Sequence, residues 1–459
     1  MNIYLHVETT IRELDSKLLL ATLAASRGHE VIISDIEGIE KGIIRGMLAP
    51  GIYHTKSLTA VRSKIERHQS IIDKGNLITS IDEESGLAWH GYETFARTRF
   101  SEKTIKDASG VFGWGNEDVD TLKQVYPKYS YKIHRTGSPR VDLWKLKLAE
   151  YWGTPSETPN RPFLLVVSNM TYANSVMPFF NIISKEQQRG HYERNPGLFL
   201  ENFKEASEKF RITGEFIEAI QHLAKNNNDY DIVLRPHQNE NIEAWRVYLK
   251  GIPNVHVIRQ GSISAWVKNA FAVMHNGCTT ALEATVHGKP LVTYIPFKPR
   301  RDNELSNELG YRIQNKEELL QKVNALFNDK ESNNKNSLNK ILPPQVSKKL
   351  YIDDNELAAE KMIRVWESLA DANPGLSKPS NWNMYKLILK FMKFNGFMGR
   401  LIRNLLKGKF SFKNENYKFN PLNSHDIYGR VSRLQKILGI EEKLDCKVIS
   451  DRTVLIKRK

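Results

Sequence analysis

Two short apolar runs, each ending in a polar loop that leads toward a helical pattern, constrain the fold of this chain most strongly. Ile232-Val233-Leu234 stops at Arg235-Pro236-His237, and the run 270–274 stops at His275-Asn276-Gly277 before a helical pattern that contains Glu283. Strands that end in polar loops and feed helices form a parallel sheet with those loops along its carboxyl edge, where open α/β folds bind ligands. The second half of the chain is therefore predicted to be an α/β domain with a ligand-binding edge.

The loops at this edge carry groups that suit a phosphate-bearing ligand. Arginine and histidine side chains can neutralise a phosphate, and a helix starting near Thr279 would offer hydroxyls, free backbone N–H groups and the positive end of its dipole. A glutamate one turn later could accept hydrogen bonds from a ribose or sugar hydroxyl, or it could be an ordinary exposed helix charge. His275 and Asn276 could equally be local turn residues. The residues predicted to bind the phosphate and nucleotide are Arg235, His237, Asn276, Gly277, Thr279, Thr280 and Glu283.

The chain has 459 residues, which is too long for one ordinary hydrophobic core. Shifts in composition predict a first domain over 1–152, a second over 161–330, a helix over 350–372 that packs back at the domain junction, and a basic tail over 375–459. The N-terminal run is too short and polar for a signal peptide, and no apolar run reaches the length of a spanning helix. Two cysteines suit a reducing compartment, so a cytoplasmic protein is expected.

The first half of the chain begins with a strand–helix–strand pattern. Residues 2–7 alternate as a strand, 18–27 have helical periodicity, and 30–34 form a second strand. A dense set of charged residues between the first strand and the helix is expected in a loop at the carboxyl edge of the sheet. Helix capping and solvation are the alternatives to a role with a ligand. These residues are Glu8, Arg12, Glu13, Asp15 and Lys17.

Three consecutive carboxylates follow another strand-like run, 76–80. If Asp82, Glu83 and Glu84 lay in a ligand cleft, their mutual repulsion would raise the pKa of one carboxyl group and supply a general acid or base. A solvated loop is the alternative. No pair of aspartates with metal-ligand spacing stands in a loop at a strand end, so no essential metal is expected.

The tail is strongly basic, whereas the rest of the chain is close to neutral. Residues 375–459 hold 19 Lys and Arg against six Asp and Glu, so +13 of the formal net charge of +15 lies there. Within the tail, 384–407 places six Lys and Arg in one arc of about 140° and most of its Phe, Leu, Ile and Met opposite. This pattern predicts a helix lying on an anionic membrane surface, and a helix packed on the main body is the alternative. No nucleic-acid-binding module is recognisable, so nucleic acid is not an expected partner.

Motifs in both halves carry a resemblance to a known family. The first half contains Glu8, RELDSK (12–17), SIDEESG (80–86), GWG (113–115) and TGSPRVD (136–142). The second half contains RPHQNE (235–240), Trp266, HNGCTTALEA (275–284) and GKP (288–290). With these motifs the first 370 residues or so resemble two-domain GT-B glycosyltransferases. The similarity is greatest to bacterial surface-carbohydrate proteins related to transferases of 3-deoxy-manno-octulosonic acid (Kdo) and sialic-acid-like sugars. One departure is Gln238, because related transferases of acidic sugars have proline after the histidine.

The resemblance implies an α/β fold of two Rossmann-like domains facing a cleft, to which the tail adds a basic amphipathic helical extension. It implies a CMP-activated acidic sugar as donor substrate, no cofactor or metal, and a surface-polysaccharide or lipid-linked glycan acceptor at the inner face of the bacterial inner membrane. A catalytic carboxylate is expected on the first domain, and whether the reaction is inverting or retaining stays open. The candidate carboxylates are Glu83, Glu8 and Asp82, followed by Glu84. The residues expected to hold the donor's carboxylate or an acceptor group are Arg12, Lys17 and Arg140.

Three other functions remain open. A glycerol- or ribitol-phosphate transferase of wall-polymer synthesis would use a CDP-linked donor on the same fold. A nucleotide-sugar 2-epimerase would need no membrane-binding tail. A nucleic-acid-binding protein would use the charge of the tail, although the apolar residues between its lysines suit lipid better.

Overall fold

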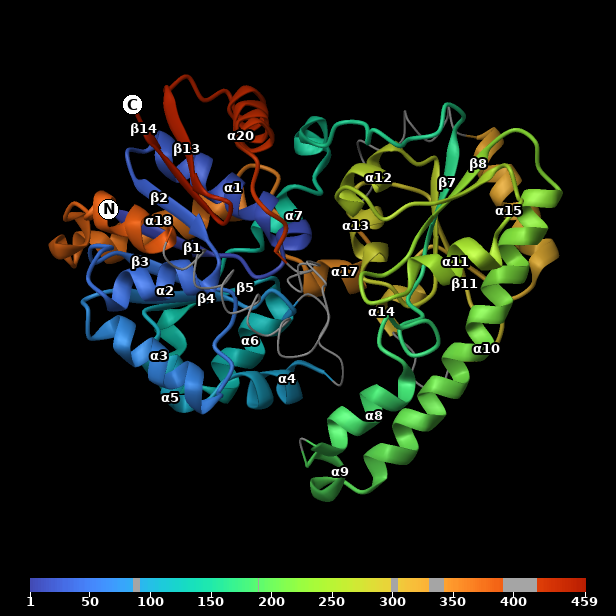
Figure 1. Cartoon of the computed structure of the whole chain (residues 1–459), viewed down its shortest axis with the longest axis horizontal. Helices are drawn as coiled ribbons and strands as arrows, with labels where there is room; N and C mark the ends of the chain where they lie inside the picture. Colours follow the sequence, from blue (N-terminus) through green and yellow to red (C-terminus); the bar gives the residue numbers. More distant parts are fainter. Residues whose placement is uncertain (86–90, 189, 299–303, 330–341, 391–418) are drawn as a thin grey trace, which may run out of the picture. The chain divides into compact units, whose positions relative to one another are not determined.

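The computed structural model describes the chain apart from residues 86–90, 189, 299–303, 330–341 and 391–418 (Figure 1). It divides into two compact units. Unit 1 consists of Met1–Leu143 and Ser347–Lys459, and unit 2 consists of Trp144–Val346. The last part of the chain therefore returns to the unit in which the chain begins. Helix α17 (Pro344–Lys349) contains the second crossing.

Unit 1 is built on an eight-stranded sheet in the order β13-β14-β2-β1-β3-β4-β5-β6. The strands from β2 to β6 in that order are parallel, and the two C-terminal strands join the β2 edge antiparallel. The parallel part reads 2-1-3-4-5-6, so its order reverses between β1 and β3, and doubly wound folds bind ligands at such a reversal. The strands are β1 (Asn2–His6), β2 (Glu30–Ser34), β3 (Ile52–Thr55), β4 (Leu77–Ile81), β5 (Gly110–Gly113), β6 (Ile133–Arg135), β13 (Leu444–Ser450) and β14 (Thr453–Arg458).

Helices pack on both faces of this sheet (Figure 1). Helix α1 lies against β2 and β14 and is covered by α18 and α20, so nearly all of its residues are buried. The other face carries α2 and α3, where Tyr4, Tyr53, Ile39 and Ile71 belong to one buried apolar cluster. The helices of unit 1 are α1 (Thr10–Ser26), α2 (Ile36–Ile44), α3 (Arg62–Ile72), α4 (Tyr92–Arg99), α5 (Glu102–Asp107), α6 (Asn116–Val125), α7 (Pro139–Asp142), α18 (Ala358–Asp371) and α20 (Ser424–Leu438).

Helix α1 begins eight residues before the predicted start at residue 18, which corrects the expected charged loop. Arg12 and Lys17, with the acidic residues between them, lie in the first turns of the helix, and only Glu8 stays in the loop after β1. The physical reason is the carboxylate of Glu13, which is fully buried and accepts the backbone N–H groups of Glu8 (2.8 Å) and Thr9 (3.3 Å). It thereby satisfies N–H groups that a helix start leaves without partners.

Unit 2 contains a six-stranded, fully parallel sheet in the order β12-β11-β10-β7-β8-β9. Numbered within the unit, this is the Rossmann order, and it reverses between β7 and β10. The predicted α/β class with two Rossmann-like units is confirmed. The strands are β7 (Phe163–Val167), β8 (Asp231–Arg235), β9 (Val255–Val257), β10 (Ala272–His275), β11 (Leu291–Tyr294) and β12 (Tyr311–Ile313). The helices are α8 (Phe179–Gln188), α9 (His191–Arg194), α10 (Gly197–Lys225), α11 (Ile242–Tyr248), α12 (Ile263–Asn269), α13 (Thr280–Val286), α14 (Glu304–Glu308) and α15 (Lys316–Asn328).

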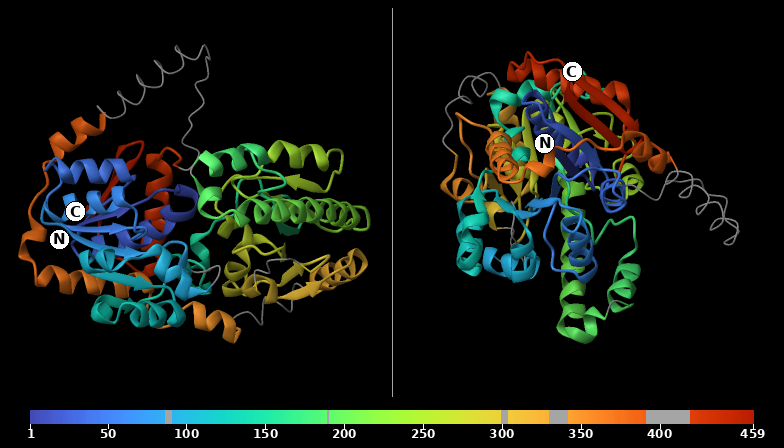
Figure 2. Two further views of the ribbon diagram at one scale, coloured as in Figure 1. Left: turned by 90° about the horizontal axis from the view of Figure 1, so that it is seen from below. Right: turned by 90° about the vertical axis from the view of Figure 1, so that its left-hand side faces the viewer.

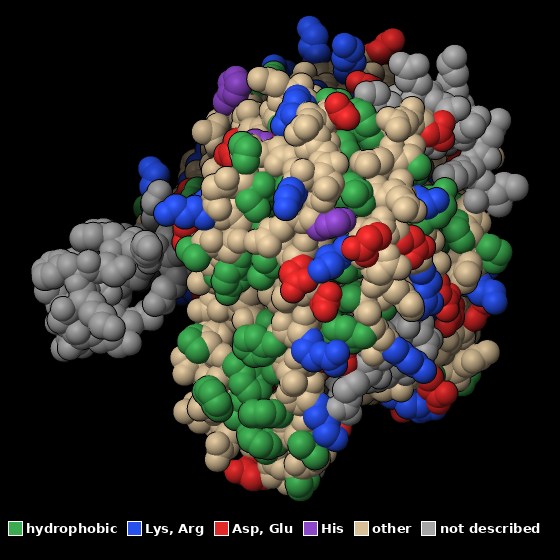
Figure 3. Space-filling view, turned by 90° about the vertical axis from the view of Figure 1, so that its right-hand side faces the viewer, with side chains coloured by type: hydrophobic (Ala, Val, Ile, Leu, Met, Phe, Trp, Pro, Cys, Tyr) green, Lys and Arg blue, Asp and Glu red, His purple; other side chains and the backbone are tan. Residues whose placement is uncertain are grey.

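A helical hairpin of α8 and α10 projects from unit 2 beyond its sheet (Figures 1 and 2). Edge-to-face contact between Phe179 and Phe203 (5.6 Å between ring centroids) joins the two helices. Large apolar side chains remain exposed on and beside the hairpin, and Figure 3 shows apolar side chains gathered over this part of the molecule. They are Val176, Met177, Phe180, Phe199, Leu200, Phe203 and Phe210.

The predicted basic tail is not one separate appendage. Residues 420–459 form α20 and the β13–β14 hairpin, which complete the sheet of unit 1 beside the N-terminal strands (Figure 2). Residues 382–390 are helical, and Tyr385, Ile388 and Leu389 are buried in the core of unit 1. The start of the predicted membrane helix therefore packs on the main body, and the rest of 384–407 lies outside the described residues. Among the helices that the structure describes, none combines the length and the apolar character needed to cross a bilayer.

Candidate active site

Glu83, two residues after the end of β4, is a buried carboxylate among the predicted catalytic residues. Its Oε1 accepts a hydrogen bond from Nζ of Lys17 at 2.8 Å, and the side chains are 4% and 1% exposed. Arg140 approaches the other carboxylate oxygen at 3.8 Å, donates to the Glu83 carbonyl at 3.2 Å and lies over the Trp114 ring. Oε2 has no hydrogen-bond partner among the described residues. Three predicted site residues thus meet at one point, where a buried carboxylate oxygen lies 3.8 Å from Arg140 and has no hydrogen-bond partner among the described residues.

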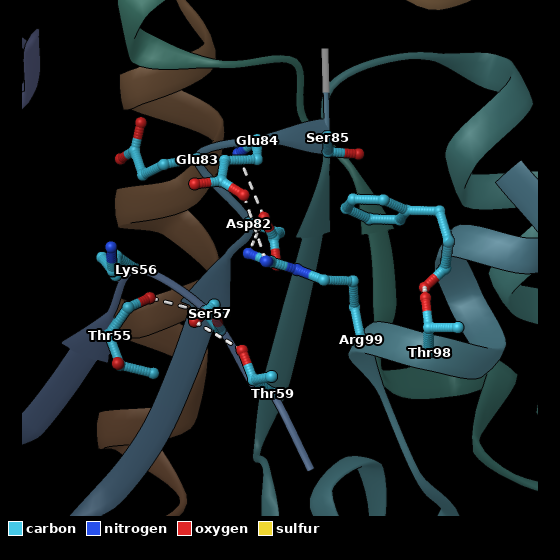
Figure 4. Close-up of polar contacts among 12 residues, drawn as sticks. Thr55, Lys56, Ser57, Thr59, Asp82, Glu83, Glu84, Ser85, Thr98 and Arg99 are labelled. Atoms are coloured by element: carbon cyan, nitrogen blue, oxygen red, sulfur yellow. Dashed lines mark hydrogen bonds and ion pairs between the residues drawn. The ribbon is translucent and has the colours of Figure 1, made fainter. Parts of the chain in front are cut away.

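Asp82 is held differently, although it is the next residue (Figure 4). Arg99 forms two hydrogen bonds with its carboxylate, from Nε to Oδ2 at 3.0 Å and from Nη2 to Oδ1 at 2.9 Å. The backbone N–H of Glu84 donates to Oδ1 at 3.0 Å. Burial raises the pKa of Asp82, while Arg99 acts in the opposite direction. Asp82 therefore fixes the loop through Arg99, and Glu84 is a half-exposed second partner of the same arginine at 3.1 Å.

Glu8 lies at the end of β1 and is paired with Lys56, which follows β3. Its side chain is 35% exposed, far more than that of Glu83. Arg12 donates to Glu13 at 2.9 Å and so belongs to the buried N-terminal turn of α1. Two of the three predicted carboxylates, Glu8 and Glu83, are therefore each paired with a lysine at the carboxyl edge of the sheet, while Arg12 supports the helix start.

The GWG motif has a structural explanation that the sequence did not provide. Asp118, buried in α6, accepts the N–H groups of Trp114 (2.8 Å) and Gly115 (2.9 Å) and the hydroxyl of Ser85 (2.8 Å). Burial raises its pKa to about 6, against the effect of these donors. A side chain at Gly115 would overlap the Lys349 carbonyl. The signal for Asp118 was its position three residues after Gly115, where a helix-capping acid belongs.

The TGSPRVD motif serves a helix from the far end of the chain. Asp142 accepts the N–H groups of Ala358 and Ala359, both at 3.0 Å, at the start of α18. Gly137 has a φ of +81°, and its Cα lies so close to the Tyr351 carbonyl that a Cβ would stand 2.6 Å from the oxygen. Of this motif, only Arg140 turns toward the Glu83 site.

In unit 2, Arg235 at the end of β8 is committed to the protein backbone. Its guanidinium donates to the carbonyls of Gln260 and Gly261 (2.8 Å to the second) and stacks over Trp266 at 5.3 Å. Burial, followed by the neighbouring Arg259, lowers its pKa to about 10. Arg235 therefore fixes the loop before α12, so its predicted contact with a phosphate would have to compete with these bonds.

The His275-Asn276-Gly277 turn lies at the reversal of strand order between β7 and β10. His275 is fully buried, exchanges a hydrogen bond with Thr293 at 2.8 Å, and has its pKa lowered to about 3 by burial. Asn276 donates to the Tyr294 carbonyl at 2.8 Å. Gly277, with a φ of +59°, accepts from Asn169 at 3.2 Å through its carbonyl. The side chain of Asn276 thus bonds to strand β11, and the backbone of Gly277 bonds to the loop after β7.

Glu240 is a buried carboxylate that the sequence analysis missed. It is fully buried and accepts three hydrogen bonds of 2.7 Å, from the Ser168 hydroxyl, the Met170 N–H and the Trp245 indole. It thereby ties the loop after β7 to the loop after β8. In the sequence it appears only as the last residue of RPHQNE, and nothing local indicates that it is buried.

Lys209, on α10, is the cation that the sequence analysis missed. It is half-buried beside Glu205, Glu208, Glu240 and Cys278. Burial lowers its pKa, and the carboxylates act in the opposite direction. A long helix from outside the motifs therefore brings a positive charge to the turn after β10, which only the tertiary structure reveals.

The remaining predicted residues of this edge differ in exposure. His237 is exposed, with its Nδ1 accepting the Asn239 N–H at 3.3 Å. Thr279 is exposed before α13, whereas Thr280 is buried and accepts from the Cys278 thiol at 3.3 Å. Glu283 is 4% exposed within α13, so it is not an exposed helix charge. His237 and Thr279 are the predicted residues most accessible to a ligand.

Throughout the described part of the chain, no group of three or more His, Cys, Asp or Glu side chains is arranged to hold a metal ion.

The comparisons with known proteins bear on the fold. No family model matches the chain, and no curated protein sequence matches it.

Several solved structures are similar to the chain over most of its length. A UDP-GlcNAc 2-epimerase from Neisseria meningitidis bound to UDP-GlcNAc is 12% identical over 80% of this chain and 100% of that one, with a TM-score of 0.47. The epimerase from Methanocaldococcus jannaschii is 13% identical with the same coverage and TM-score. The wall teichoic acid polymerase TagF is 10% identical over 70% of this chain and 74% of the other, with a TM-score of 0.42.

Proposed function

We propose that this chain is an enzyme that acts on a nucleotide-activated sugar and transfers the sugar to a glycan acceptor. The position of Glu83 is the observation that carries the proposal. A buried carboxylate held by Lys17 and Arg140, with one oxygen lacking a hydrogen-bond partner among the described residues, supports a role for Glu83 as the general base. That oxygen would take the proton of the acceptor hydroxyl while the hydroxyl oxygen bonds to the sugar carbon and the nucleotide phosphate leaves with its bonding electrons.

Unit 2 would hold the nucleotide at the turn after β10. Lys209 supplies positive charge there, and the exposed side chains of His237 and Thr279 supply hydrogen bonds. Among the described residues of this edge, Arg235 is bonded to carbonyls, so Lys209 is the cation that we assign to the phosphate. One cation suits a nucleoside monophosphate better than a diphosphate. A CMP-linked acidic sugar is therefore the donor that we propose first, with Arg140 as a partner for its carboxylate.

The test is a panel of CMP-, CDP-, UDP- and GDP-linked sugars, with turnover followed by nucleotide release and product mass. Glu83→Gln should lose turnover by about 100-fold or more, because a general base contributes on that scale. Nucleotide binding, measured as a rise in melting temperature with CMP, should remain. Full activity of Glu83→Gln would remove it from the mechanism.

Nucleotide binding by unit 2 has a matched pair of variants on one helix. Lys209→Met should abolish the stabilisation by CMP. Lys204 is an exposed lysine of the same helix, so Lys204→Met should still be stabilised by CMP. Stabilisation by UDP but not by CMP would reject the donor that we propose.

Nucleotide-sugar 2-epimerisation is the second candidate, and the pairing of two carboxylates with lysines favours it. Glu8 with Lys56 and Glu83 with Lys17 lie at one sheet edge, and epimerisation needs one group to remove a proton from C2 and another to return it. In D₂O, an epimerase would place deuterium at C2 of the recovered nucleotide sugar without any acceptor. A transferase would leave C2 unlabelled and release nucleotide only when an acceptor is present.

We further propose that the chain works at an anionic membrane surface, which the charge of +13 in residues 375–459 supports. Lys393, Arg400, Arg403 and Lys407 should be changed together to Gln, because truncation at 375 would also remove strands of unit 1. We expect loss of co-sedimentation with anionic liposomes and unchanged melting. The control is a second variant with the same change in charge, in which four exposed basic residues of the folded C-terminal part are changed to Gln. They are Lys436, Lys443, Arg458 and Lys459. This control should still sediment with the liposomes. Unchanged sedimentation of the first variant would refute the proposal.

A further inference from the structure

Two buried histidines of unit 1 lack hydrogen-bond partners at the place where the strand order reverses. His6 ends β1 and is 2% exposed, and His68 on α3 is 4% exposed. Neither ring nitrogen of His6, nor Nε2 of His68, has a partner among the described residues. Burial and nearby lysines keep both rings neutral, with the pKa of each lowered to about 3. Polar atoms that are buried without partners are rare in native proteins, so each calls for a ligand or water.

The same place holds a positive charge without a carboxylate partner. Lys64, also on α3, donates to the hydroxyl of Ser57 at 2.7 Å and makes no ion pair with the described residues. Burial lowers its pKa to about 8, and Lys56 adds to this effect. Its side chain is half-buried.

The surrounding charges are otherwise compensated. Lys56 is paired with Glu8, Lys17 with Glu83, Arg99 with Asp82, and Arg67 with Glu40 at 3.0 Å. Lys64 therefore stands among these cations without a carboxylate ion pair in the described part of the chain, beside histidine rings that can each donate one N–H. Parallel α/β sheets bind ligands at such a reversal of strand order, here the loops after β1 and β3.

We propose that His6, His68 and Lys64 form an oxyanion-binding site in unit 1, separate from the nucleotide edge of unit 2. Its ligand is a phosphate-type group. Two sources share this chemistry, namely a phosphate carried by the acceptor and the phosphate of the nucleotide. Assigning the oxyanion to the acceptor rests on the function proposed above, whereas the existence of the site does not.

Water is the alternative occupant of this site. It would satisfy the hydrogen bonding of the histidine nitrogens, but it would not pair with the positive charge of Lys64. An oxyanion does both, since it accepts from the N–H groups and pairs with the ammonium. The two occupants therefore differ in one measurable property: only the oxyanion makes the stability of the protein depend on phosphate and on the charge at Lys64.

The experiment compares thermal unfolding and calorimetric titration of the whole chain in inorganic phosphate and in chloride at equal ionic strength. Phosphate should raise the melting temperature, and Lys64→Gln should weaken phosphate binding by about tenfold or more. Lys74→Gln, an exposed lysine just after α3, should bind phosphate as the unaltered protein does. His68→Leu should be at least as stable in chloride, because it removes a buried polar group without a partner, and it should gain less from phosphate.

Addition of CMP distinguishes the two sources. Additive stabilisation by phosphate and CMP places the oxyanion on the acceptor, and loss of CMP binding in Lys64→Gln places it on the nucleotide. Phosphate binding that is unchanged in Lys64→Gln would overturn the site, and so would the absence of any stabilisation by phosphate, which would mean that water alone fills it. Failure of all nucleotides to bind would reject the proposed function and leave the phosphate result standing.

Discussion

The ion pair of Lys17 and Glu83 is a buried contact between two charged residues of unit 1. Both side chains are almost completely buried, and they come from α1 and from the loop after β4. Taking two charges out of water costs free energy that their attraction offsets only with good geometry, so such a pair seldom adds to stability. The pair lies at the carboxyl edge of the sheet, and Oε2 of Glu83 has no hydrogen-bond partner among the described residues. Both features suggest that the pair is kept for function rather than for stability.

A double-mutant cycle tests the burial of this pair. Lys17→Met should lower the free energy of unfolding by about 3–5 kcal/mol, because it leaves Glu83 buried and charged without its hydrogen-bonded lysine, with Arg140 at 3.8 Å as the remaining cation. Lys17→Met/Glu83→Leu should lose clearly less, since neither charge remains. Urea denaturation followed by circular dichroism measures both.

The exposed pair of Arg62 and Glu66 on α3 is the control for this cycle. Removing either partner should change the midpoint of unfolding very little, because solvent screens the pair. If Lys17→Met/Glu83→Leu were as unstable as Lys17→Met alone, the loss of stability would come from altered packing and not from the unpaired charge of Glu83.

Several residues that the motifs single out have structural roles in the folded chain. Asp142 caps α18. Asn276 and His275 bond to the neighbouring strand β11. A motif indicates that residue types matter at fixed positions, but it does not distinguish a ligand contact from a backbone contact. That distinction needs the partner atom, which often comes from a distant segment.

At the scale of elements, the C-terminal hairpin is part of the sheet rather than an extension of it. Strand β14 pairs antiparallel with β2, Leu455 lies opposite Ile32, and Ser34 shares a hydrogen bond of 2.8 Å with Thr453. Arg430 of α20 pairs with Asp15 of α1 at 2.8 Å. The hairpin therefore covers a β2 edge that would otherwise expose unpaired backbone groups.

Leu455→Asp tests this integration. Leu455 is 6% exposed within the core of unit 1, so a charge there should lower the free energy of unfolding by roughly 3 kcal/mol or more. The melting temperature and the soluble fraction after expression measure the effect. Arg458→Asp, at the exposed end of the same strand, should change the melting temperature little. Equal melting temperatures for Leu455→Asp and the unaltered protein would contradict the integration of β14.

For the whole molecule, the buried histidines make stability depend on pH. His6, His68, His275 and His287 have their pKa lowered to about 3, mainly by burial, from an ordinary value of 6.5. The unfolded chain takes up these protons below about pH 6.5, whereas the folded chain does not until about pH 3. Their contribution to stability is therefore complete above that upper value and is lost as the pH falls through this window.

Asp118, whose pKa burial raises from 3.8 to about 6, acts in the opposite direction, as do three other carboxyl groups whose pKa burial raises, Asp82, Glu30 and Glu40. Burial also lowers the pKa of His29, His54 and His134, so seven histidines act against these four carboxyl groups. The free energy of unfolding from urea titrations should therefore fall from neutral pH to about pH 5. His275→Asn should show a shallower fall than the unaltered protein. A free energy of unfolding that rises toward pH 5 would contradict the burial of these rings.

The sequence by itself determined the periodic features of this protein. Alternating and continuous apolar runs ending at polar loops were enough to predict two parallel α/β units, because burial of apolar side chains imposes a local period on every strand and helix. The run of carboxylates after one strand made Glu83 a candidate, and the family resemblance added Lys17 and Arg140, although neither predicted their contact.

Only the tertiary structure decided which charges meet. Glu240, Asp118 and Lys209 gave weak local signals or none, since their partners lie on other elements. The burial of Tyr385, Ile388 and Leu389 and the pairing of β14 with β2 turned parts of an apparent tail into core. Such contacts join segments hundreds of residues apart, and their energy depends on burial and distance, which no local pattern encodes.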